Sequence, residues 1–299
     1  IRRPDQPVED GVIRLSIPQD EAVEFDDVVR GTVRFEPQDI DDFVILRSNG
    51  TPTYHLASTV DDVDYEITHV ARGEDLLPST PKHIILTRAM GNTEPTYAHL
   101  PLLFGTDGKK LSKRHGATSL SEYRDAGFLA DAVFNYLAIL GWSPDADTTV
   151  FSRQEAVGAF DLNDVNKNPA AFDPEKLSWM NGEYIRAMDT EAFVEMIKPY
   201  VEEAVGRDLS GDEWELFLPL APLVQERTKL LPEAGEQVVF LFEDFESYDQ
   251  KSWTKVMAKD GVSDILIAGR DTLARLDAWE AATIEGALRA LPDPHEHES

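Results

Sequence analysis

The sequence predicts an α/β region that is followed by an all-α region. Residues 8 to 47 alternate short β-type runs with acid-rich turns, and strand, loop and helix patterns then follow one another up to residue 118. From residue 119 onward, apolar residues recur at helical spacing. A chain of 299 residues also has enough material for two or more domains, each with its own core.

The α/β region is expected to alternate strands with helices. Its first strands are predicted at residues 12–17, 32–35 and 41–46. Asn49-Gly50 favours a tight turn, and a helix is expected to start near Thr53. A buried strand is predicted over residues 66–71, and Pro81 favours the first turn of a helix over residues 82–90.

The all-α region carries start and stop signals for its helices. Ser119 with Glu122, and Ser152 with Glu155, form capping-box patterns at two expected helix starts. Between them, the apolar residues at helical spacing are Leu129, Ala132, Val133, Tyr136, Leu137 and Leu140. Further helical patterns cover residues 213–231, 234–243 and 272–290, with breaks expected near Pro169, Pro199 and Pro232.

The composition excludes several classes of protein. There are 56 acidic and 28 basic residues, a formal net charge of −28, which disfavours a protein that coats DNA or RNA through charge alone. The chain has no cysteine, so disulfides and thiolate metal sites are excluded, and its dispersed histidines lack metal-ligand spacing. No run approaches the roughly 20 apolar residues that span a bilayer. We therefore expect a cytoplasmic protein with no DNA partner and no membrane contact.

One loop departs from this acidic composition. Residues 109–114, with the sequence Lys-Lys-Leu-Ser-Lys-Arg, form the only dense positive cluster, and they follow a predicted turn at residues 105–108. Lysine side chains on a flexible loop can follow phosphate oxygens as charge moves during a displacement reaction. The alternative interpretation is a solvated surface loop. Phosphate chemistry is therefore the first hypothesis for this segment.

The basic loop also carries a motif. Lys110-Leu111-Ser112-Lys113-Arg114 resembles the KMSKS signature of class I aminoacyl-tRNA synthetases, and residues 107–116 resemble its glutamyl-tRNA synthetase form. Other blocks resemble the same family in the same order: residues 52–57 (the amino-acid pocket helix), 67–75 and 79–81 (the next strand, loop and helix), 97–103 (the strand before the loop) and 172–182 (the stem-contact region).

This resemblance implies a fold and a division into domains. The fold would be the second half of a Rossmann-type class I catalytic domain, followed by helical stem-contact and anticodon-binding regions. The expected domains are the end of an acceptor-stem-binding insertion (1–46), the catalytic half with the KMSKS-like loop (47–118), a stem-contact domain (119–187) and a partial anticodon-binding domain (188–299). The family's His-x-Gly-His motif does not occur in the chain. We therefore expect a fragment of a longer enzyme, with little or no activity of its own.

The resemblance also implies site residues. Those expected to bind glutamate are Tyr54, Ser58 and Arg72, and those expected to contact ATP are Asp75, Leu103 and Lys113. The expected catalytic residues, which would stabilise charge on the leaving pyrophosphate, are Lys110, Ser112, Lys113 and Arg114.

For two arginines, the sequence also allows an interpretation without a binding role. Arg72 follows the predicted strand, at the edge where open α/β sheets bind ligands, and its guanidinium can form a fork with a carboxylate. The alternative for Arg72 is a surface arginine. Arg227 is the expected anticodon contact because it lies in an acid-rich helical run, and the alternative is a solvated helix residue.

The implied activity is ATP-dependent charging of tRNA(Glu) with L-glutamate through a glutamyl-adenylate. Mg²⁺ would accompany ATP, no protein-bound zinc is expected, and the protein would be a monomer. Three alternatives stay open. A glutaminyl-tRNA synthetase shares the general fold, the short tRNA-modifying relatives lack an anticodon-binding half, and a non-catalytic tRNA-binding fragment would need no ATP chemistry.

Overall fold

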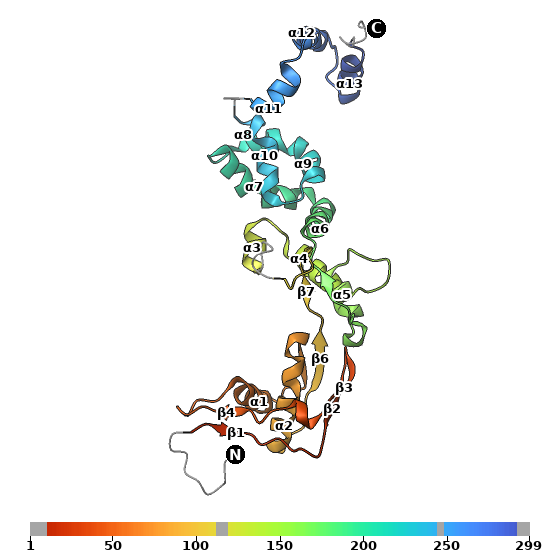
Figure 1. The fold of residues 1–299 in the computed structure, drawn as a ribbon. Helices are drawn as coiled ribbons and strands as arrows, with labels where there is room; N and C mark the ends of the chain where they lie inside the picture. Colours follow the sequence, from red (N-terminus) through yellow and green to blue (C-terminus); the bar gives the residue numbers. More distant parts are fainter. Residues whose placement is uncertain (1–10, 112–118, 244–247, 292–299) are drawn as a thin grey trace. The chain divides into compact units, whose positions relative to one another are not determined.

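The chain is described by a computed structural model that covers residues 11–111, 119–243 and 248–291 (Figure 1). It divides into two compact units, Ile1–Val239 and Phe240–Ser299. Among the described residues, every strand lies in the first unit, and from residue 174 onward the elements are helical. The predicted order, an α/β region followed by an all-α region, is confirmed.

A four-stranded sheet in the order β3-β2-β6-β5 lies at the centre of the α/β region (Figure 1). Its strands are β2 (Val23–Asp27), β3 (Gly31–Phe35), β5 (His69–Gly73) and β6 (Thr96–Leu100). β2 and β3 form an antiparallel hairpin, whereas β6 runs parallel to both of its neighbours. β6 meets β2 at one register pair, Asp27 with Tyr97, and pairs with β5 along its full length, with Arg72 opposite His99.

The connection from β5 to β6 contains η2 (Glu74–Ser79) and α2 (Thr80–Ala89), a β-α-β unit of the kind that parallel strands require. Pro81 occupies the first turn of α2 as predicted, and α1 (Tyr54–Asp64) packs against α2. The strand predicted over residues 66–71 begins only at His69, and its expected burial is wrong. β5 is the edge strand of its sheet, so His69 and Ala71 remain exposed.

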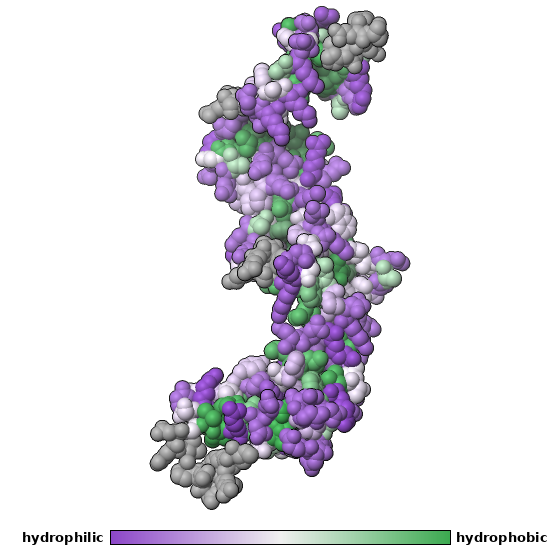
Figure 2. Space-filling model, in the orientation of Figure 1, coloured by the Kyte–Doolittle hydropathy of each residue, from purple (hydrophilic) through white to green (hydrophobic). Residues whose placement is uncertain are grey.

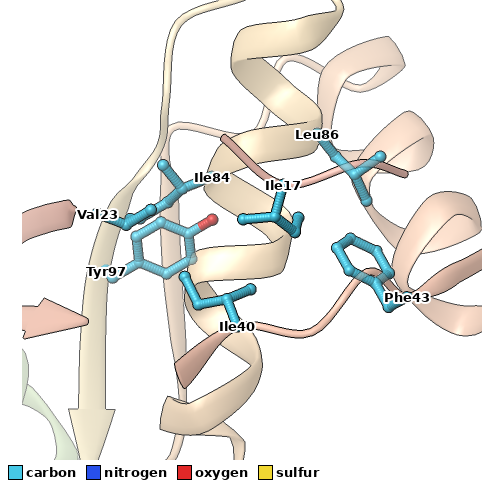
Figure 3. Packing of buried hydrophobic residues seen from close by; sticks show 7 residues of the cluster. All are labelled: Ile17, Val23, Ile40, Phe43, Ile84, Leu86 and Tyr97. Atoms are coloured by element: carbon cyan, nitrogen blue, oxygen red, sulfur yellow. The ribbon is translucent and has the colours of Figure 1, made fainter. Parts of the chain in front are cut away.

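The core of this region joins the sheet to α2 (Figure 3). Its buried side chains, from strands, helix and the surrounding loops, are Ile17, Val23, Ile40, Phe43, Ile84, Leu86 and Tyr97. Ile84 is completely buried on α2, and the ring of Tyr97 on β6 lies edge-on to Phe25 at 5.7 Å. Burying one such side chain contributes about 1.5–3 kcal/mol, so this cluster fixes α2 on the sheet.

Two smaller strand pairs flank the main sheet. β1 (Ile13–Arg14) pairs antiparallel with β4 (Val44–Leu46), and β7 (Leu103–Phe104) pairs parallel with β8 (Ala170–Ala171). A short 3₁₀ helix, η1, covers Pro37–Asp39. The strands predicted at 12–17 and 41–46 are therefore shorter than expected. β2 was not predicted because three of its five residues are acidic, a composition that β-propensity disfavours.

Helices make up the rest of the first unit. They are α3 (Leu120–Asp125), α4 (Ala130–Ile139), α5 (Arg153–Ala159), η4 (Leu162–Asp164), α6 (Pro174–Ala187), α7 (Thr190–Val205), α8 (Gly211–Phe217), η5 (Leu218–Leu220), α9 (Ala221–Arg227), α10 (Leu231–Val238) and η6 (Val239–Leu241), the last of which crosses into the second unit. Both predicted capping boxes are confirmed at α3 and α5, where Ser119 and Ser152 cap the third helical residues, Glu122 and Glu155.

The second core of this unit lies between α4 and α6. Its buried residues are Val133, Tyr136, Phe172, Leu177 and Met180. Asn181, also completely buried, ties α6 to two other segments. Its Oδ1 accepts from the N–H of Leu129 at 2.8 Å, and its Nδ2 donates to the carbonyl of Lys229 at 2.5 Å. α6 is therefore fixed to the start of α4 and to the loop before α10.

The break predicted near Pro199 is wrong. Pro199 lies inside α7, which continues through it for 16 residues. An interior proline costs a helix about 3 kcal/mol, but α7 buries Phe193, Ile197 and Val201 completely and packs closely against α10. Tertiary packing therefore outweighs the local penalty.

The run predicted as one helix over residues 213–231 is instead divided into α8, η5 and α9. Pro219 and Pro222 lie in the first turns of η5 and α9, where a missing backbone N–H costs nothing. The break near Pro232 is confirmed, because Pro232 lies at the start of α10. The pattern over 234–243 corresponds to the end of α10 followed by η6.

The second unit is helical throughout its described residues. It contains α11 (Gln250–Ser252), the π-helical turn η7 (Trp253–Met257), α12 (Val262–Leu273) and α13 (Ala281–Arg289). α12 and α13 pack on each other, and the helix predicted over 272–290 is broken between them. Within the described ranges, every helix is too short or too polar to cross a membrane. Figure 2 shows mainly hydrophilic residues on the visible face, with smaller hydrophobic patches among them.

Candidate functional site

Arg72 lies near the carboxyl end of β5, where parallel strands of open sheets bind ligands. Its half-buried guanidinium is held on two sides. Nε donates to Nε2 of His99 at 3.1 Å, and Nη2 donates to Oγ1 of Thr80 at 2.8 Å and to the carbonyl of Leu76 at 3.3 Å. Among the described residues, Nη1 makes no hydrogen bond. Arg72 therefore presents one fixed cationic edge that an anion can approach.

Two buried residues lie behind Arg72. His99, opposite Arg72 on β6, has no exposed surface, and its Nδ1 lies 2.6 Å from Oδ2 of Asp27, which is also buried. The other carboxylate oxygen, Oδ1, accepts the backbone N–H groups of Val29, Arg30 and His99 at 2.9–3.1 Å. A chain of contacts thus runs from the end of β2 through β6 to the guanidinium on β5.

The glutamate-binding residues predicted on α1 lie beside α2. Tyr54, the first residue of α1, is 54% exposed, and its ring lies 5.7 Å from the ring of His83 on α2. Ser58, one turn further along α1, is half-buried. Neither forms a hydrogen bond with Arg72 in the described structure. Tyr54 is linked to Arg72 through α2, since its ring contacts His83, and His83 lies one turn beyond Thr80, which holds the guanidinium.

The two histidines in this region favour their neutral forms. Nδ1 of His55 lies 3.1 Å from Nε2 of His83. Burial, together with the positive charge of Arg72 and other neighbours, lowers the pKa of His83 to about 4. Burial and the charges of Lys82 and Arg72 also lower the pKa of His55. Near pH 7 these rings therefore add no positive charge to that of Arg72.

The basic loop begins on a short hairpin. The N–H of Leu111 donates to the carbonyl of Leu103 at 2.8 Å, and the N–H of Gly105 donates to the carbonyl of Lys109 at 2.8 Å. Gly108 closes the turn with a φ of 73°, which glycine adopts without strain. Leu103, the predicted ATP contact, is half-buried on β7. The position of Lys110 is thus fixed by backbone pairing.

Lys110 is held toward the β5 end of the sheet. Its Nζ lies 2.9 Å from Oδ2 of Asp75, which is in the first turn of η2 just after β5. The hydrogen bond and charge of Lys110 hold the pKa of the Asp75 carboxyl below its usual value. The structure therefore brings Lys110 and Asp75 together just beyond the end of β5, the strand that carries Arg72.

Of the four remaining predicted residues, only Arg227 lies in the part of the chain that the structure describes. Ser112, Lys113 and Arg114 lie outside the described residues. Arg227 is exposed at the end of α9, and no described contact connects it with Arg72 or Lys110. No group of three or more His, Asp or Glu side chains that could hold a metal ion is found within the described ranges.

Sequence reasoning missed the residues that hold Arg72. Asp27 is 72 residues from His99 and lies in a strand that was not predicted. The sequence alone predicts no specific role for His99 and places Thr80 only near the start of a helix. The one signal that could have pointed to these residues is the location of Arg72 at a strand end, because a half-buried charge there needs hydrogen-bond partners.

An apolar cavity of about 520 Å³ lies elsewhere in the first unit, lined by side chains that include Leu137, Trp142, Val157 and Phe160. Its lining is almost entirely apolar and carries none of the predicted site residues. It therefore has no group that could bind a phosphate or a carboxylate, and we assign the candidate site to the Arg72 and Lys110 region.

Family models match most of the chain. Residues 2–179 match the model described as tRNA synthetases class I (E and Q), catalytic domain, and residues 192–298 match the model described as an anticodon binding domain.

Individual relatives agree with these matches. A glutamate–tRNA ligase of Dehalococcoides mccartyi strain CBDB1 is 44% identical over 285 residues, covering 95% of this chain and 58% of the relative. Glutamate–tRNA ligase 1 of Coxiella burnetii strain RSA 493 is 40% identical over 296 residues, covering 99% of this chain and 62% of the relative. The chain thus spans about three fifths of the length of these relatives.

Solved structures show the same partial coverage. The chain is similar to a glutamate tRNA ligase from Elizabethkingia meningosepticum, crystallised in complex with its amino acid, with a TM-score of 0.77 and 33% identity over 92% of this chain and 57% of that one. Glutamate-tRNA synthetase from Elizabethkingia anophelis gives a TM-score of 0.75 at the same identity and coverage.

Proposed function

Since the chain belongs to the class I tRNA synthetases (E and Q), we propose that it is part of an enzyme that attaches glutamate to tRNA(Glu) at the expense of ATP. One observation carries this proposal. Arg72 is held by His99 and Thr80 at the end of β5, Nη1 makes no hydrogen bond among the described residues, and Lys110 of the basic loop pairs with Asp75 just beyond the same strand.

In the proposed complex, Arg72 receives a carboxylate of glutamate. Nη1 donates to it in a charge-assisted hydrogen bond, which is about twice as strong as a neutral one. The hydroxyl of Tyr54 supplies a second donor, and Ser58 lies one helical turn away on α1. Glutamine offers an amide in place of this carboxylate, so the site would lose its ionic partner and reject glutamine.

The first chemical step joins glutamate to ATP. An oxygen of the α-carboxylate of glutamate attacks the α-phosphorus of ATP, a new P–O bond forms, and the bond to the β-phosphate breaks to release pyrophosphate. We propose that Lys110 and Lys113 stabilise the negative charge that grows on pyrophosphate, with Ser112 and Arg114 supporting the same grip. Mg²⁺ belongs here to the ATP substrate, and Asp75 and Leu103 are the proposed contacts to ATP.

The second step transfers the glutamyl group. A hydroxyl of the terminal ribose of tRNA attacks the carbonyl carbon of glutamyl-adenylate, and AMP leaves. We propose that residues 1–46 end the acceptor-stem-binding insertion, that 47–118 form the catalytic half, that 119–187 contact the stem, and that 188–299, through Arg227, read the anticodon. The match to an anticodon-binding model over 192–298 supports the last assignment. A cytoplasmic monomer remains part of the proposal.

Pyrophosphate exchange tests the activity. With tRNA(Glu) present, as in every exchange assay below, the full-length gene product is expected to exchange radiolabelled pyrophosphate into ATP with L-glutamate and to give less than a hundredth of that rate with L-glutamine. Equal rates would contradict the assignment, and a preference for glutamine would identify a glutaminyl-tRNA synthetase instead. A protein that binds tRNA(Glu) without exchange would be the non-catalytic alternative.

A further inference from the structure

We propose that His99, held by Asp27, is a positioning residue that aims Arg72 at the substrate and so sets the affinity for glutamate. The inference rests on the proposed function for the identity of the substrate. Its geometry rests on the described contacts alone: Asp27 to His99 at 2.6 Å and Arg72 to His99 at 3.1 Å.

The donor chemistry fixes the tautomer of His99. Nε of an arginine carries a hydrogen and can only donate, so Nε2 of His99 must be the acceptor. In a neutral imidazole the proton then lies on Nδ1, where Oδ2 of Asp27 accepts it. Asp27 therefore specifies the tautomer that offers a lone pair to Arg72. The logic is that of a carboxylate that orients a histidine in other enzymes.

Asp27 is itself immobile. Its two oxygens accept the imidazole N–H and the backbone N–H groups of Val29, Arg30 and His99, and its side chain has no exposed surface. Burial alone would raise the pKa of this carboxyl, but the hydrogen bonds with His99 and with the backbone of Arg30 outweigh burial and lower it. The carboxylate therefore stays ionised, with every one of these donors pointed at it.

Burial favours the neutral form of His99. Burial lowers the pKa of His99, the contact with Asp27 opposes that effect, and the positive charges of Arg72 and Arg30 add to it. A protonated His99 would direct an N–H from Nε2 at the Nε–H of Arg72, which would remove the hydrogen bond and add repulsion between the two cations. A neutral His99 is thus the form compatible with the observed position of Arg72.

The hydrogen bonds of Arg72 fix the orientation of its guanidinium and therefore of Nη1. With Nε engaged by His99 and Nη2 engaged by Thr80 and Leu76, rotation of the guanidinium about its long axis would break three hydrogen bonds. Nη1 therefore faces the site in one orientation before any ligand binds. Preorganisation of this kind raises affinity because less ordering remains to be done on binding.

Two variants of His99 separate positioning from folding. In His99→Asn the amide ends near the position of Nδ1, so it keeps a donor to Asp27 and loses the acceptor for Arg72. In His99→Gln the amide ends near the position of Nε2, so it keeps an acceptor for Arg72 and loses the donor to Asp27. We expect His99→Asn to raise KM for glutamate about tenfold, the change expected for one hydrogen bond to a charged group. His99→Gln should stay within about threefold of the parent while unfolding more easily.

The measurement is pyrophosphate exchange in the full-length gene product, with KM for glutamate and for ATP determined separately, and Tm from thermal unfolding. Thr87→Val is the matched control, because Thr87 is buried on α2 and, among the described residues, its hydroxyl bonds only within its own helix, at the carbonyl of His83. It should lower Tm and leave both KM values unchanged. On an Arg72→Lys background, His99→Asn should change KM for glutamate less than twofold, because the contact is already absent.

A purely structural His99 would give the opposite ranking, with KM for glutamate following Tm across the two variants, and that result would overturn the proposal. An unchanged KM in His99→Asn alongside a raised KM in Arg72→Lys would overturn it as well. If the parent protein did not activate glutamate, the proposed function would fail first. ¹⁵N NMR of this chain would then test the contacts from Asp27 through His99 to Arg72 independently of activity. Two results would support the proposed contacts: an Nδ1–H tautomer of His99, and an Arg72 Nε–H signal that shifts in His99→Asn but not in His99→Gln. An Nε2–H tautomer of His99 would overturn the proposal.

Discussion

Lys110 and Asp75 lie 35 positions apart in the sequence and form an ion pair, with 2.9 Å between Nζ and Oδ2. Both side chains are about half exposed, and exposed ion pairs contribute only about 0–1 kcal/mol. The pair is therefore weak enough to exchange. A phosphate of higher charge can replace the Asp75 carboxylate as the partner of Lys110. The ion pair therefore orients the lysine side chain but does not prevent it from binding a phosphate.

Lys110→Ala should reduce the rate of glutamate activation with little effect on stability. We expect kcat to fall at least tenfold, because the lysine acts on charge that grows in the transition state, while the free energy of unfolding changes by less than about 0.5 kcal/mol. Lys109→Ala is the control. Lys109 is 82% exposed, and its Nζ is 4.0 Å from the nearest oxygen of Asp107. Equal losses in the two variants would refute a specific role for Lys110.

Arg72→Lys keeps the charge but removes Nε and the planar guanidinium. The lysine cannot donate to His99, Thr80 and a ligand in the same geometry, so KM for glutamate should rise by about tenfold or more. KM for ATP should stay within about twofold. Arg88→Lys, at an exposed pair with Glu94 on the same unit, should leave both values unchanged. Binding of glutamate as tight in Arg72→Lys as in the parent would argue against this arginine as its ligand.

Stability should fall on mild acidification because of His83. Its pKa in the folded protein is about 4, mainly through burial, against an ordinary value of 6.5. Between these values the unfolded chain binds a proton that the folded chain does not, so stability is full above pH 6.5 and declines as the pH falls toward 4. Urea unfolding at pH 7.5 and pH 5.0 measures the decline. His83→Gln should reduce it, and an identical decline in the variant would show that His83 is not its source.

Replacing each of two glycines with alanine should change the free energy of unfolding in opposite directions. A Cβ on Gly235 would lie 2.5 Å from the carbonyl oxygen of Tyr200, where α10 meets α7, so Gly235→Ala should destabilise by about 1–3 kcal/mol. Gly158 lies within α5, and an added Cβ would meet nothing within 4 Å, so Gly158→Ala should stabilise by about 0.5–1 kcal/mol. Denaturant unfolding of both variants gives the comparison, and a shared sign would contradict the packing argument.

Arg227→Ala should weaken recognition of the anticodon. We expect kcat/KM for tRNA(Glu) to fall about tenfold, with KM for glutamate and for ATP unchanged, because in the proposed complex neither small substrate contacts the anticodon-binding residues. Arg207→Ala is the comparison, since the guanidinium of Arg207 is already engaged by Glu213 at 2.7 Å. Unaltered discrimination between cognate and anticodon-substituted tRNA in Arg227→Ala would remove this residue from the site.

Local chemistry explains which parts of the fold were predictable from the sequence. The capping boxes at Ser119 and Ser152 involve residues three positions apart, so the pattern and the contact coincide. Pro199 is expected to end a helix because its local cost is known, but Phe193 and Val201 of the same helix are buried and α7 packs against α10, which reverses the outcome. Prediction failed where partners from elsewhere in the chain decide the conformation.

The candidate site divides in the same way. The position of Arg72 at a strand end followed from the order of elements, and the turn before Lys110 followed from its residues, although its pairing as a hairpin was not predicted. The contacts of Arg72 with His99 and of His99 with Asp27 did not, because they cross from one strand to the next and depend on which strands are neighbours. A single sequence carries no direct signal of that neighbourhood.

The four hydrogen bonds at Asp27 imply that tolerance to substitution differs along the chain of contacts. A library of variants selected only for folded protein should admit many residues at Arg72, which is half-buried and lies on an edge strand. It should admit almost none at Asp27, because each replacement leaves several buried donors without an acceptor. Selection for growth that depends on the proposed activity should reject substitutions at both Asp27 and Arg72. Comparing the two selections would separate residues kept for architecture from those kept for chemistry, and His99 would fall between them.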